Sequence, residues 1–97
     1  MADDEWPFDQ ARSCAVITLR SIAFGGEAIL YVSHDADDHG WQFLDGRPVN
    51  EGEAMVVALE EIAEMDPSVM GVAGLPPGWF AVRESVDSSW RRRPKGR

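Results

Sequence analysis

Two short hydrophobic segments determine much of what this chain can form. The first, Ala28–Val32, is apolar at every position, which is typical of a strand covered on both faces. The second, Trp41–Leu44, follows it after a polar stretch that ends in Gly40. Because strands joined by a short polar loop pair antiparallel, the sequence predicts a hairpin whose first strand lies centrally in a sheet.

Two further strands and a helix are predicted from the other hydrophobic patterns. Cys14–Leu19 is rich in β-branched residues, and Trp79–Arg83 begins with four apolar residues. Asn50 lies three residues before Glu53, as in a capping box, and predicts a helix over 51–65. The apolar residues of that helix lie three or four apart and form one stripe: Met55, Val56, Leu59, Ile62 and Ala63.

A shorter helical turn is predicted from Pro67 to Val72, because Asp66 is an N-cap residue and Pro67 fits the first helical position. The predicted order of elements is therefore β-β-β-α-β. It indicates an α+β domain, with an antiparallel sheet of about four strands and one main helix packed on one face.

Length and composition fit a single small domain. The chain has 97 residues, of which 44% are hydrophobic and 27% charged, as in ordinary globular proteins. Its acidic start is unlike a signal peptide, and its apolar runs are too short to cross a bilayer. Cys14 is the only cysteine, which favours a reducing compartment and predicts a cytoplasmic protein. Eight of the nine basic residues are arginine, a composition that indicates a bacterial source.

Charge is distributed unevenly along the chain. Residues 1–90 contain 17 acidic and four basic residues, a net charge of −13. Residues 91–97 contain the other five basic residues and no acid. We expect an acidic N-terminal segment over 1–12, one domain over 13–86, and a basic, disordered tail over 87–97. A phosphate backbone would be repelled by the acidic body, so nucleic-acid binding by the folded body is not expected.

The polar loop between the hairpin strands holds both histidines of the chain. Asp35, Asp37 and Gly40 fit the first positions of a calcium-binding EF-hand loop, but Gly46 stands where the bidentate glutamate belongs. His34 and His39, with Asp35 or Asp38, could instead bind a transition metal. The spacing lies across a hairpin loop rather than on one helix face, so a solvated loop without metal or cofactor is the main interpretation.

Catalysis is not expected from the candidate groups of the chain. Ser33, His34 and Asp35 are consecutive and are the three residue types of a catalytic triad. Neighbouring side chains of a strand point to opposite faces, so Ser33 and His34 would not share a proton. The segment Phe24–Glu27 lacks the spacing and the lysine of a phosphate-binding loop.

The acidic face of the predicted helix is the main functional clue. No lysine or arginine lies between Asn50 and Asp66, and Glu61 and Glu64 fall near the negative end of the predicted helix. Glu60 and Glu64 form a like-charge pair one turn apart. Such repulsion is consistent either with a solvated face or with a surface for a basic partner. The candidate partner-binding residues are Glu60, Glu61, Glu64, Asp37, Asp38 and His39.

Several of these motifs resemble a small family of bacterial domains of unknown function. The resemblance rests on Gly40-Trp41-Gln42-Phe43-Leu44 and on Leu75-Pro76-Pro77-Gly78-Trp79, and it covers most of residues 15–84. The family usually has an acid where this chain has His39. Some members are grouped with immunity proteins that neutralise polymorphic toxins. The resemblance implies a protein partner, with a basic toxin domain as the candidate, and brings no catalytic residues.

Three interpretations follow from the sequence. The first is a non-enzymatic interaction protein, monomeric or homodimeric, whose acidic face attracts a basic protein partner and which does not bind membranes. The second is a small metal-binding protein or hydrolase that uses the loop from His34 to His39. The third is a homodimer formed through an open edge strand. The aromatic residues Trp41, Phe43, Trp79 and Phe80 are expected mostly in the core.

Overall fold

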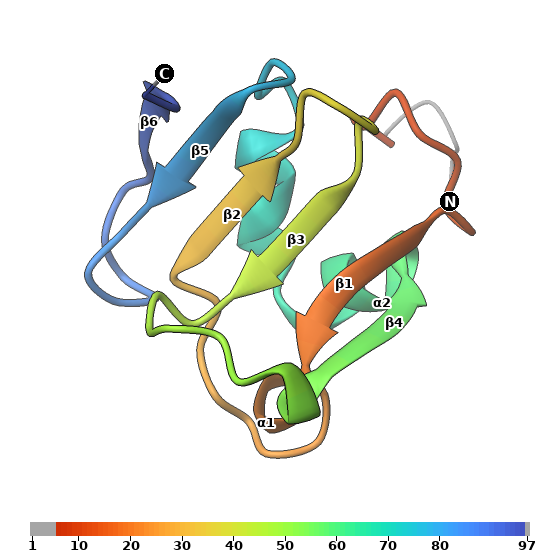
Figure 1. Ribbon diagram of the computed structural model, residues 1–97, viewed down its shortest axis with the longest axis vertical. Helices are drawn as coiled ribbons and strands as arrows, with labels where there is room; N and C mark the ends of the chain where they lie inside the picture. Colours follow the sequence, from red (N-terminus) through yellow and green to blue (C-terminus); the bar gives the residue numbers. More distant parts are fainter. Residues whose placement is uncertain (1–5, 97) are drawn as a thin grey trace.

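A computed structural model describes residues 6–96 and shows a six-stranded sheet with short helices (Figure 1). The strands lie in the order β4-β1-β3-β2-β5-β6. Their bounds are β1 Ala15–Leu19, β2 Tyr31–His34, β3 Trp41–Leu44, β4 Ala54–Ala58, β5 Trp79–Val82 and β6 Arg91–Pro94. The helical elements are α1 Arg20–Ala23, η2 Glu51–Glu53, α2 Leu59–Met65 and η3 Pro67–Val72.

The predicted central hairpin is confirmed, but its first strand, β2, is Tyr31–His34 rather than Ala28–Val32. Strands β2 and β3 pair antiparallel from Tyr31 with Leu44 to His34 with Trp41, and β2 lies between β3 and β5. The α+β class and a mostly antiparallel sheet are also confirmed, although the sheet has six strands rather than about four. One pair, β1 with β3, is parallel.

The predicted helix over 51–65 is wrong in its first half. Asn50 does cap a helix, because its side chain accepts from the Gly52 amide, but that helix is the single 3-10 turn η2. The residues that follow form β4, which pairs with β1 at five positions. The run Met55-Val56-Val57 fits both a helical stripe and a strand, and pairing with β1 decides between them. Within the predicted range only η2 and α2 are helical. The separate turn η3 begins at Pro67 after the Asp66 cap, as predicted.

The predicted disordered tail is wrong for residues 91–94. These residues form β6, which pairs with β5 from Trp79 with Pro94 to Val82 with Arg91. Lys95 extends this attachment, because its Nζ donates to Asp35 Oδ1 at 2.6 Å. Arg92 donates to the Gly71 carbonyl on the other face. The acidic body therefore attracts the basic segment, and backbone pairing with β5 completes its order.

The predicted N-terminal segment over 1–12 is attached to the domain where it is described. Phe8 is buried and meets Trp41 edge to face, with ring centroids 5.3 Å apart. Trp6 packs against Phe8 and donates from Nε1 to the Gln10 carbonyl at 2.7 Å. The rest of that prediction, residues 1–5, lies outside the described residues.

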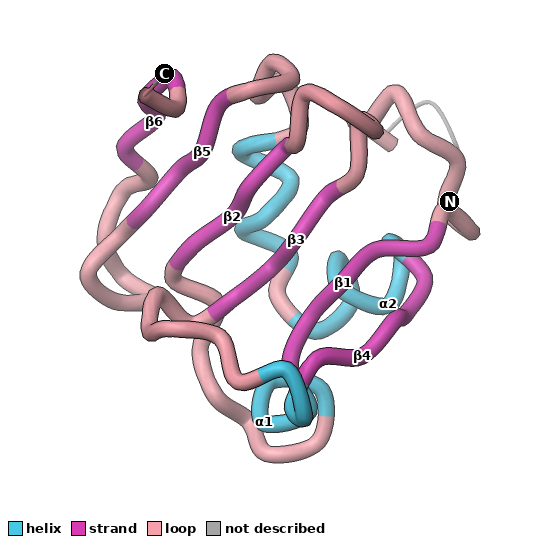
Figure 2. Tube along the Cα trace, viewed as in Figure 1, coloured by secondary structure: helices cyan, strands magenta, loops and turns pink. Residues whose placement is uncertain are grey.

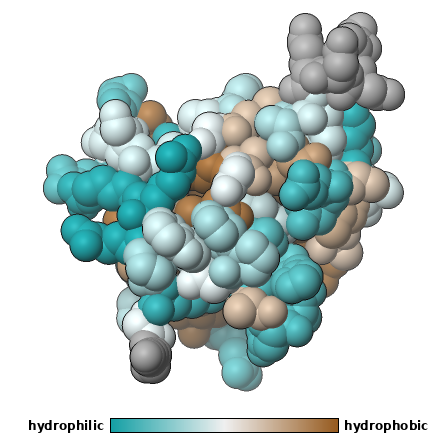
Figure 3. All heavy atoms as spheres, turned by 90° about the horizontal axis from the view of Figure 1, so that it is seen from above, coloured by the Kyte–Doolittle hydropathy of each residue, from teal (hydrophilic) through white to brown (hydrophobic). Residues whose placement is uncertain are grey.

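The two faces of the sheet differ in what covers them. Figure 2 shows α2 and η3 on one side of the strands, and the buried hydrophobic residues gather there, including Val32, Phe43, Leu59, Ile62, Val69 and Val72. The opposite face carries one cross-strand row that the pairing register defines: Val56, Ile17, Gln42, Ser33, Phe80 and Arg93. Seen from above in Figure 3, hydrophobic atoms appear in hollows between hydrophilic side chains.

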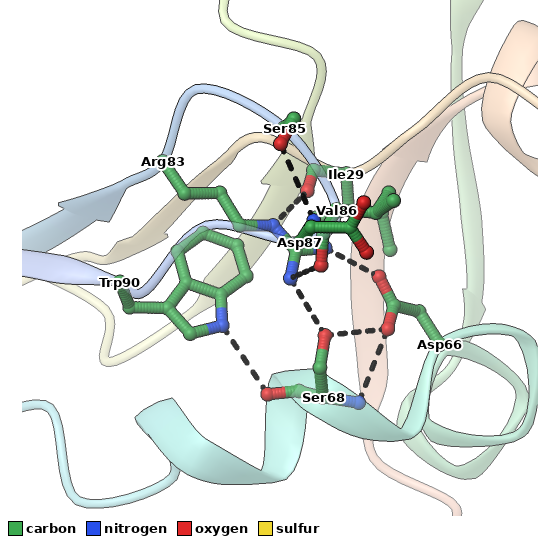
Figure 4. A network of polar contacts seen from close by, with 8 residues as sticks. All are labelled: Ile29, Asp66, Ser68, Arg83, Ser85, Val86, Asp87 and Trp90. Atoms are coloured by element: carbon green, nitrogen blue, oxygen red, sulfur yellow. Dashed lines mark hydrogen bonds and ion pairs between the residues drawn. The ribbon is translucent and has the colours of Figure 1, made fainter.

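A buried arginine joins η3, β5 and the C-terminal segment (Figure 4). The Arg83 side chain is 1% exposed, and its guanidinium pairs with Asp66 Oδ2 at 2.6 Å. It also donates to the Ile29 carbonyl and lies over the Trp90 ring at 4.2 Å. Burial by itself would raise the pKa of Asp66, but hydrogen bonds from Ser68 and Arg83 outweigh that effect and lower it below its usual value.

Candidate functional site

The six candidate residues fall into two groups at different places. Glu60 is half-buried on α2, and Glu61 and Glu64 are exposed there. Asp37, Asp38 and His39 are exposed in the β2–β3 loop. Glu61 and Glu64 line a groove beside β4, whereas His39 lines a pocket formed with Trp41 and Leu75. The structure therefore does not bring the two groups together into one site.

The position of Glu61 differs from the prediction. Helix α2 begins at Leu59, so Glu60 and Glu61 lie in its first turn, near the positive end of the helix. Glu61 Oε1 accepts from the Ala58 amide at 3.1 Å and caps the helix start. Local structure thus explains Glu60 and Glu61 without a partner. Glu64 lies in the last turn, where its negative charge is unfavourable beside the negative end of the helix.

Three exposed hydrophobic side chains lie beside these acids. Phe24 is 76% exposed, Val56 65% and Met65 42%. They come from the end of α1, from β4 and from the end of α2, and they line one groove of about 510 Å³ with Glu61 and Glu64. We call this groove, which Ala23, Met55 and Val57 also line, the β4 groove. Large exposed apolar groups beside charged ones are the usual composition of a protein-binding surface.

The conformation around Phe24 holds its side chain outward. The amide of Phe24 donates to the Arg20 carbonyl at 2.8 Å, and the Gly25 amide donates to the Ser21 carbonyl at 3.0 Å. Gly26 has a φ of 74°, which other residues rarely adopt. A Cβ at Gly25 would lie 2.7 Å from the Ser21 carbonyl oxygen. Both glycines are therefore needed for the tight turn that leaves Phe24 at the surface.

The β4 groove runs along a free strand edge. Met55, Val56 and Val57 all line it, although neighbouring side chains of a strand point to opposite faces. A groove that contacts all three must follow the edge of the strand. Among residues 6–96, β4 pairs only with β1, so its other edge carries backbone groups without a strand partner.

The β2–β3 loop is closed by its own hydrogen bonds. The Asp35 amide donates to the Gly40 carbonyl, and the Gly40 amide donates to Asp38 Oδ1, both at 2.8 Å. His39 has a φ of 59°, in the left-handed region that costs a residue with a side chain some strain. The loop therefore presents Asp37, Asp38 and His39 in a fixed arrangement, as a tight polar turn.

Asp35 is engaged inside the protein rather than available to a ligand. Its carboxylate accepts from Ser33 Oγ at 2.6 Å, from Gln42 Nε2 at 2.8 Å and from Lys95 Nζ at 2.6 Å. Burial opposes its charge, but the hydrogen bonds from Lys95, Ser33 and Gln42 lower the pKa of Asp35 below its usual value. A carboxylate that is held in this way ties β6 to the hairpin.

The triad of consecutive residues does not assemble. Ser33 Oγ bonds to Asp35 on one face, whereas His34 Nδ1 lies 2.7 Å from the Leu75 carbonyl on the other. The His34 and His39 ring centroids are 6.5 Å apart. Within residues 6–96, no group of three or more His, Cys, Asp or Glu side chains is placed to hold a metal ion.

The four expected core aromatics divide into two pairs. Trp41 and Phe43 are buried, as expected, whereas Trp79 and Phe80 are half-buried. Phe80 stacks on Tyr31 with ring centroids 5.5 Å apart.

Sequence reasoning missed the apolar part of the β4 groove. Val56 was assigned to the core stripe of a helix, and Met65 to that helix's end. The signal for Phe24 was present, because a large aromatic residue directly before Gly25-Gly26 lies in a turn, where burial is uncommon.

Comparison with known proteins gives no match: no family model, curated protein or solved structure is significantly similar to this chain. The resemblance to immunity proteins therefore stays a prediction. None of the helices in the described part of the chain has the length and apolar composition needed to cross a membrane.

Proposed function

We propose that this chain is a non-enzymatic protein-interaction module that binds a basic partner at the β4 groove. The observation that carries the proposal is the exposure of Phe24, Val56 and Met65 beside Glu61 and Glu64 along a free strand edge. A partner segment that covers this edge gains backbone hydrogen bonds from β4, apolar contacts from the three side chains and attraction from the acids.

The chemistry of the groove defines the partner segment. An extended strand can pair with β4 and place alternate side chains on the two faces of the sheet. Apolar side chains on one face would cover Val56, and basic side chains would approach Glu61 and Glu64. The acidic body, with its net charge of −13 over residues 1–90, would speed the encounter at low salt.

The family resemblance adds a candidate for that partner. It implies a basic toxin domain, which the module would neutralise in a reducing compartment such as the bacterial cytoplasm. The proposal that the β4 groove binds a basic strand does not depend on this resemblance. It can be tested without a toxin domain.

Binding can be measured with a synthetic peptide that alternates lysine and valine. We expect amide shifts in β4 and a loss of affinity at high salt, because the attraction is partly ionic. The informative variant combines Glu64→Lys with Glu61→Gln, since glutamine still offers an oxygen to the Ala58 amide. Affinity at low salt should fall about tenfold.

A peptide that alternates glutamate and valine is the matched control and should not bind. Asp37→Lys combined with Asp38→Asn, which raises the net charge by the same three units but lies in the β2–β3 loop, should leave the affinity unchanged. Equal binding of both peptides, or amide shifts confined to the β2–β3 loop, would contradict the proposal. Light scattering gives the molar mass of the free chain. The mass of a dimer would mean that a second copy, rather than a different partner, occupies the β4 edge.

A further inference from the structure

A pocket of about 260 Å³ lies at the end of the molecule that carries the β2–β3 loop. Its lining comes from three separate segments: the irregular residues 9–10, the facing ends of β2 and β3, and residues 73–77 before β5. These segments meet at the upper end of the sheet in Figure 1. The pocket is separate from the β4 groove and shares no lining residue with it.

Three buried polar atoms of this pocket have no hydrogen-bond partner within the described chain. They are Gln10 Oε1, His34 Nε2 and Trp41 Nε1, and no other buried side-chain nitrogen or oxygen of residues 6–96 shares this condition. His34 is 6% exposed and Trp41 2%. A buried polar group without a partner destabilises a fold, so three in one pocket require a common explanation.

The hydrogen-bonding role of each atom can be assigned. Because the Leu75 carbonyl can only accept, the His34 Nδ1 that lies 2.7 Å from it carries the proton. In the neutral ring, Nε2 is then an acceptor. The indole Nε1 of Trp41 can only donate, and Gln10 Oε1 can only accept. The pocket therefore offers two acceptors and one donor.

The two rings hold their nitrogens in a fixed arrangement. The His34 ring stacks on the Trp41 ring, with centroids 4.1 Å apart and planes inclined by 14°. Trp41 in turn stacks on Phe43 and meets Phe8 edge to face. This stack, together with the Leu75 bond, keeps both rings from turning away.

These roles exclude two ligand classes. A metal ion is not favoured, because within residues 6–96 no group of three or more His, Cys, Asp or Glu side chains is placed to hold one, and the Trp41 indole nitrogen offers no lone pair. An anion would meet the acceptors Nε2 and Oε1, and Asp9 at the rim would repel it. A hydroxyl group both donates and accepts, so a single one can satisfy His34 Nε2 and Trp41 Nε1 together.

We propose that this pocket binds a small neutral ligand with two neighbouring hydroxyl groups. The first hydroxyl donates to His34 Nε2 and accepts from Trp41 Nε1, and the second donates to Gln10 Oε1. The carbon frame of the ligand packs on Pro76 and Pro77 at the rim. The volume is smaller than that of pockets for drug-sized ligands and suits a compact diol or sugar-like ring.

Entry requires a small movement at the rim. The three atoms lie beneath the surface, so the ligand reaches them when residues 9–10 move outward. Those residues belong to no helix or strand and lie close to the first described residue, so they can be displaced without breaking a strand pair. Binding is then expected to be slower than diffusion allows.

The probe for the test is cis-1,2-cyclohexanediol, titrated into the isotope-labelled full chain and followed by nuclear magnetic resonance. We expect saturable shifts of the Trp41 indole proton and of the His34 Nε2 nitrogen. Tetrahydropyran, which has a ring of the same size and no hydroxyl group, should not produce them. Trp41→Phe and Gln10→Leu should each weaken the diol about tenfold, since each removes one hydrogen bond.

Trp79→Phe is the matched control, because Trp79 lies outside the lining, and it should bind the diol as the unaltered chain does. Gln10→Leu keeps the test decisive if Trp41→Phe fails to fold. Absence of saturable shifts, or equal shifts with tetrahydropyran, would overturn the proposal. In the absence of ligand, faster exchange of the Trp41 indole proton in Gln10→Leu than in the unaltered chain would also overturn it. That result would mean that Gln10 already accepts a hydrogen bond from Trp41. None of these outcomes depends on the β4 groove.

Discussion

Strands β4 and β6 form the two edges of the sheet. The two edges differ in how they are protected from pairing with another chain. β6 reads Arg-Arg-Arg-Pro and is exposed at every position. Charge and proline are common means of keeping an edge strand from pairing with another chain. β4 reads Ala-Met-Val-Val-Ala, contains neither, and has Val56 65% exposed. Of these two edges, only β4 lacks the charged residues and the proline that oppose pairing with another strand.

The attachments of the two edges differ as well. β4 is held by five paired positions with β1 and by the helix that follows it. β6 is held by pairing with β5 and by side chains from far along the chain, among them Asp35 for Lys95. The open edge is thus anchored by backbone and packing, whereas the protected edge is anchored partly by charge. This difference predicts which changes affect each edge.

Arg83→Leu should have the largest effect on stability and should loosen the β6 side. The substitution leaves Asp66 partly buried without its partner and removes the cation over Trp90. We expect a loss of about 3 kcal/mol in the free energy of unfolding, measured by urea denaturation. Arg91→Leu, whose ion pair with Glu84 is exposed, is the control and should change little. Equal losses in the two variants would contradict the role of the buried pair.

Acid should weaken the β6 side before the β4 side. Asp35 and Asp66 both have folded-state pKa values below the usual 3.8. A lowered pKa stabilises the fold at pH values above the usual value, and the contribution is lost as the pH falls through the folded value. Amide exchange in β6 should therefore accelerate below about pH 4 while exchange in β4 stays slow. In a variant that combines Asp35→Asn with Asp66→Asn, amide exchange in β6 should depend less on pH over the same range.

Val56→Lys should convert the open edge into a protected one. Lysine in an edge strand opposes pairing, and next to basic side chains it also repels. Affinity for the lysine–valine peptide should fall about tenfold, with a change in stability below about 0.5 kcal/mol because the side chain is exposed. Val56→Thr, which keeps the β-branched shape without charge, should retain most of the affinity. Unchanged binding by Val56→Lys would place the peptide elsewhere.

Lys95→Met should have the smallest effect. Its ion pair with Asp35 is partly exposed, with the lysine side chain 36% accessible. We expect a loss of about 0.5 kcal/mol, together with faster amide exchange limited to β6. A larger loss, comparable to that of Arg83→Leu, would mean that charge rather than strand pairing supplies most of the attachment.

The sequence predicted the parts of the fold that depend on near neighbours. The β2–β3 hairpin and the Asp66-Pro67 start of η3 are specified within a few residues, and both are confirmed. Strand β4 was missed because Met55-Val56-Val57 fits two periodicities, and the choice depends on β1, about 40 residues away. Strand β6 was missed because its order comes from β5 and from Asp35, not from its own composition.

The candidate sites were predicted less well, for the same reason. The acids of the β4 groove could be identified, but Phe24, Val56 and Met65 are brought beside them only by the tertiary fold. His34 was judged as part of an exposed loop, whereas the end of β2 buries it against Trp41 and Leu75. Exposure and burial of single residues depend on packing between distant segments, which one sequence does not display.

The single parallel pair, β1 with β3, has a consequence for the rate at which this chain folds. The β2–β3 hairpin needs only a short loop and can close within microseconds. β1 must then find the far side of β3, where Thr18 Oγ1 donates to the Phe43 carbonyl across 25 positions of the chain. β4 lies beyond β1 at the edge, so the β1–β4 pair joins the rest of the sheet only when β1 docks on β3. Docking of β1 is therefore expected to limit folding, and until it happens β3 exposes an unpaired edge to other newly made chains.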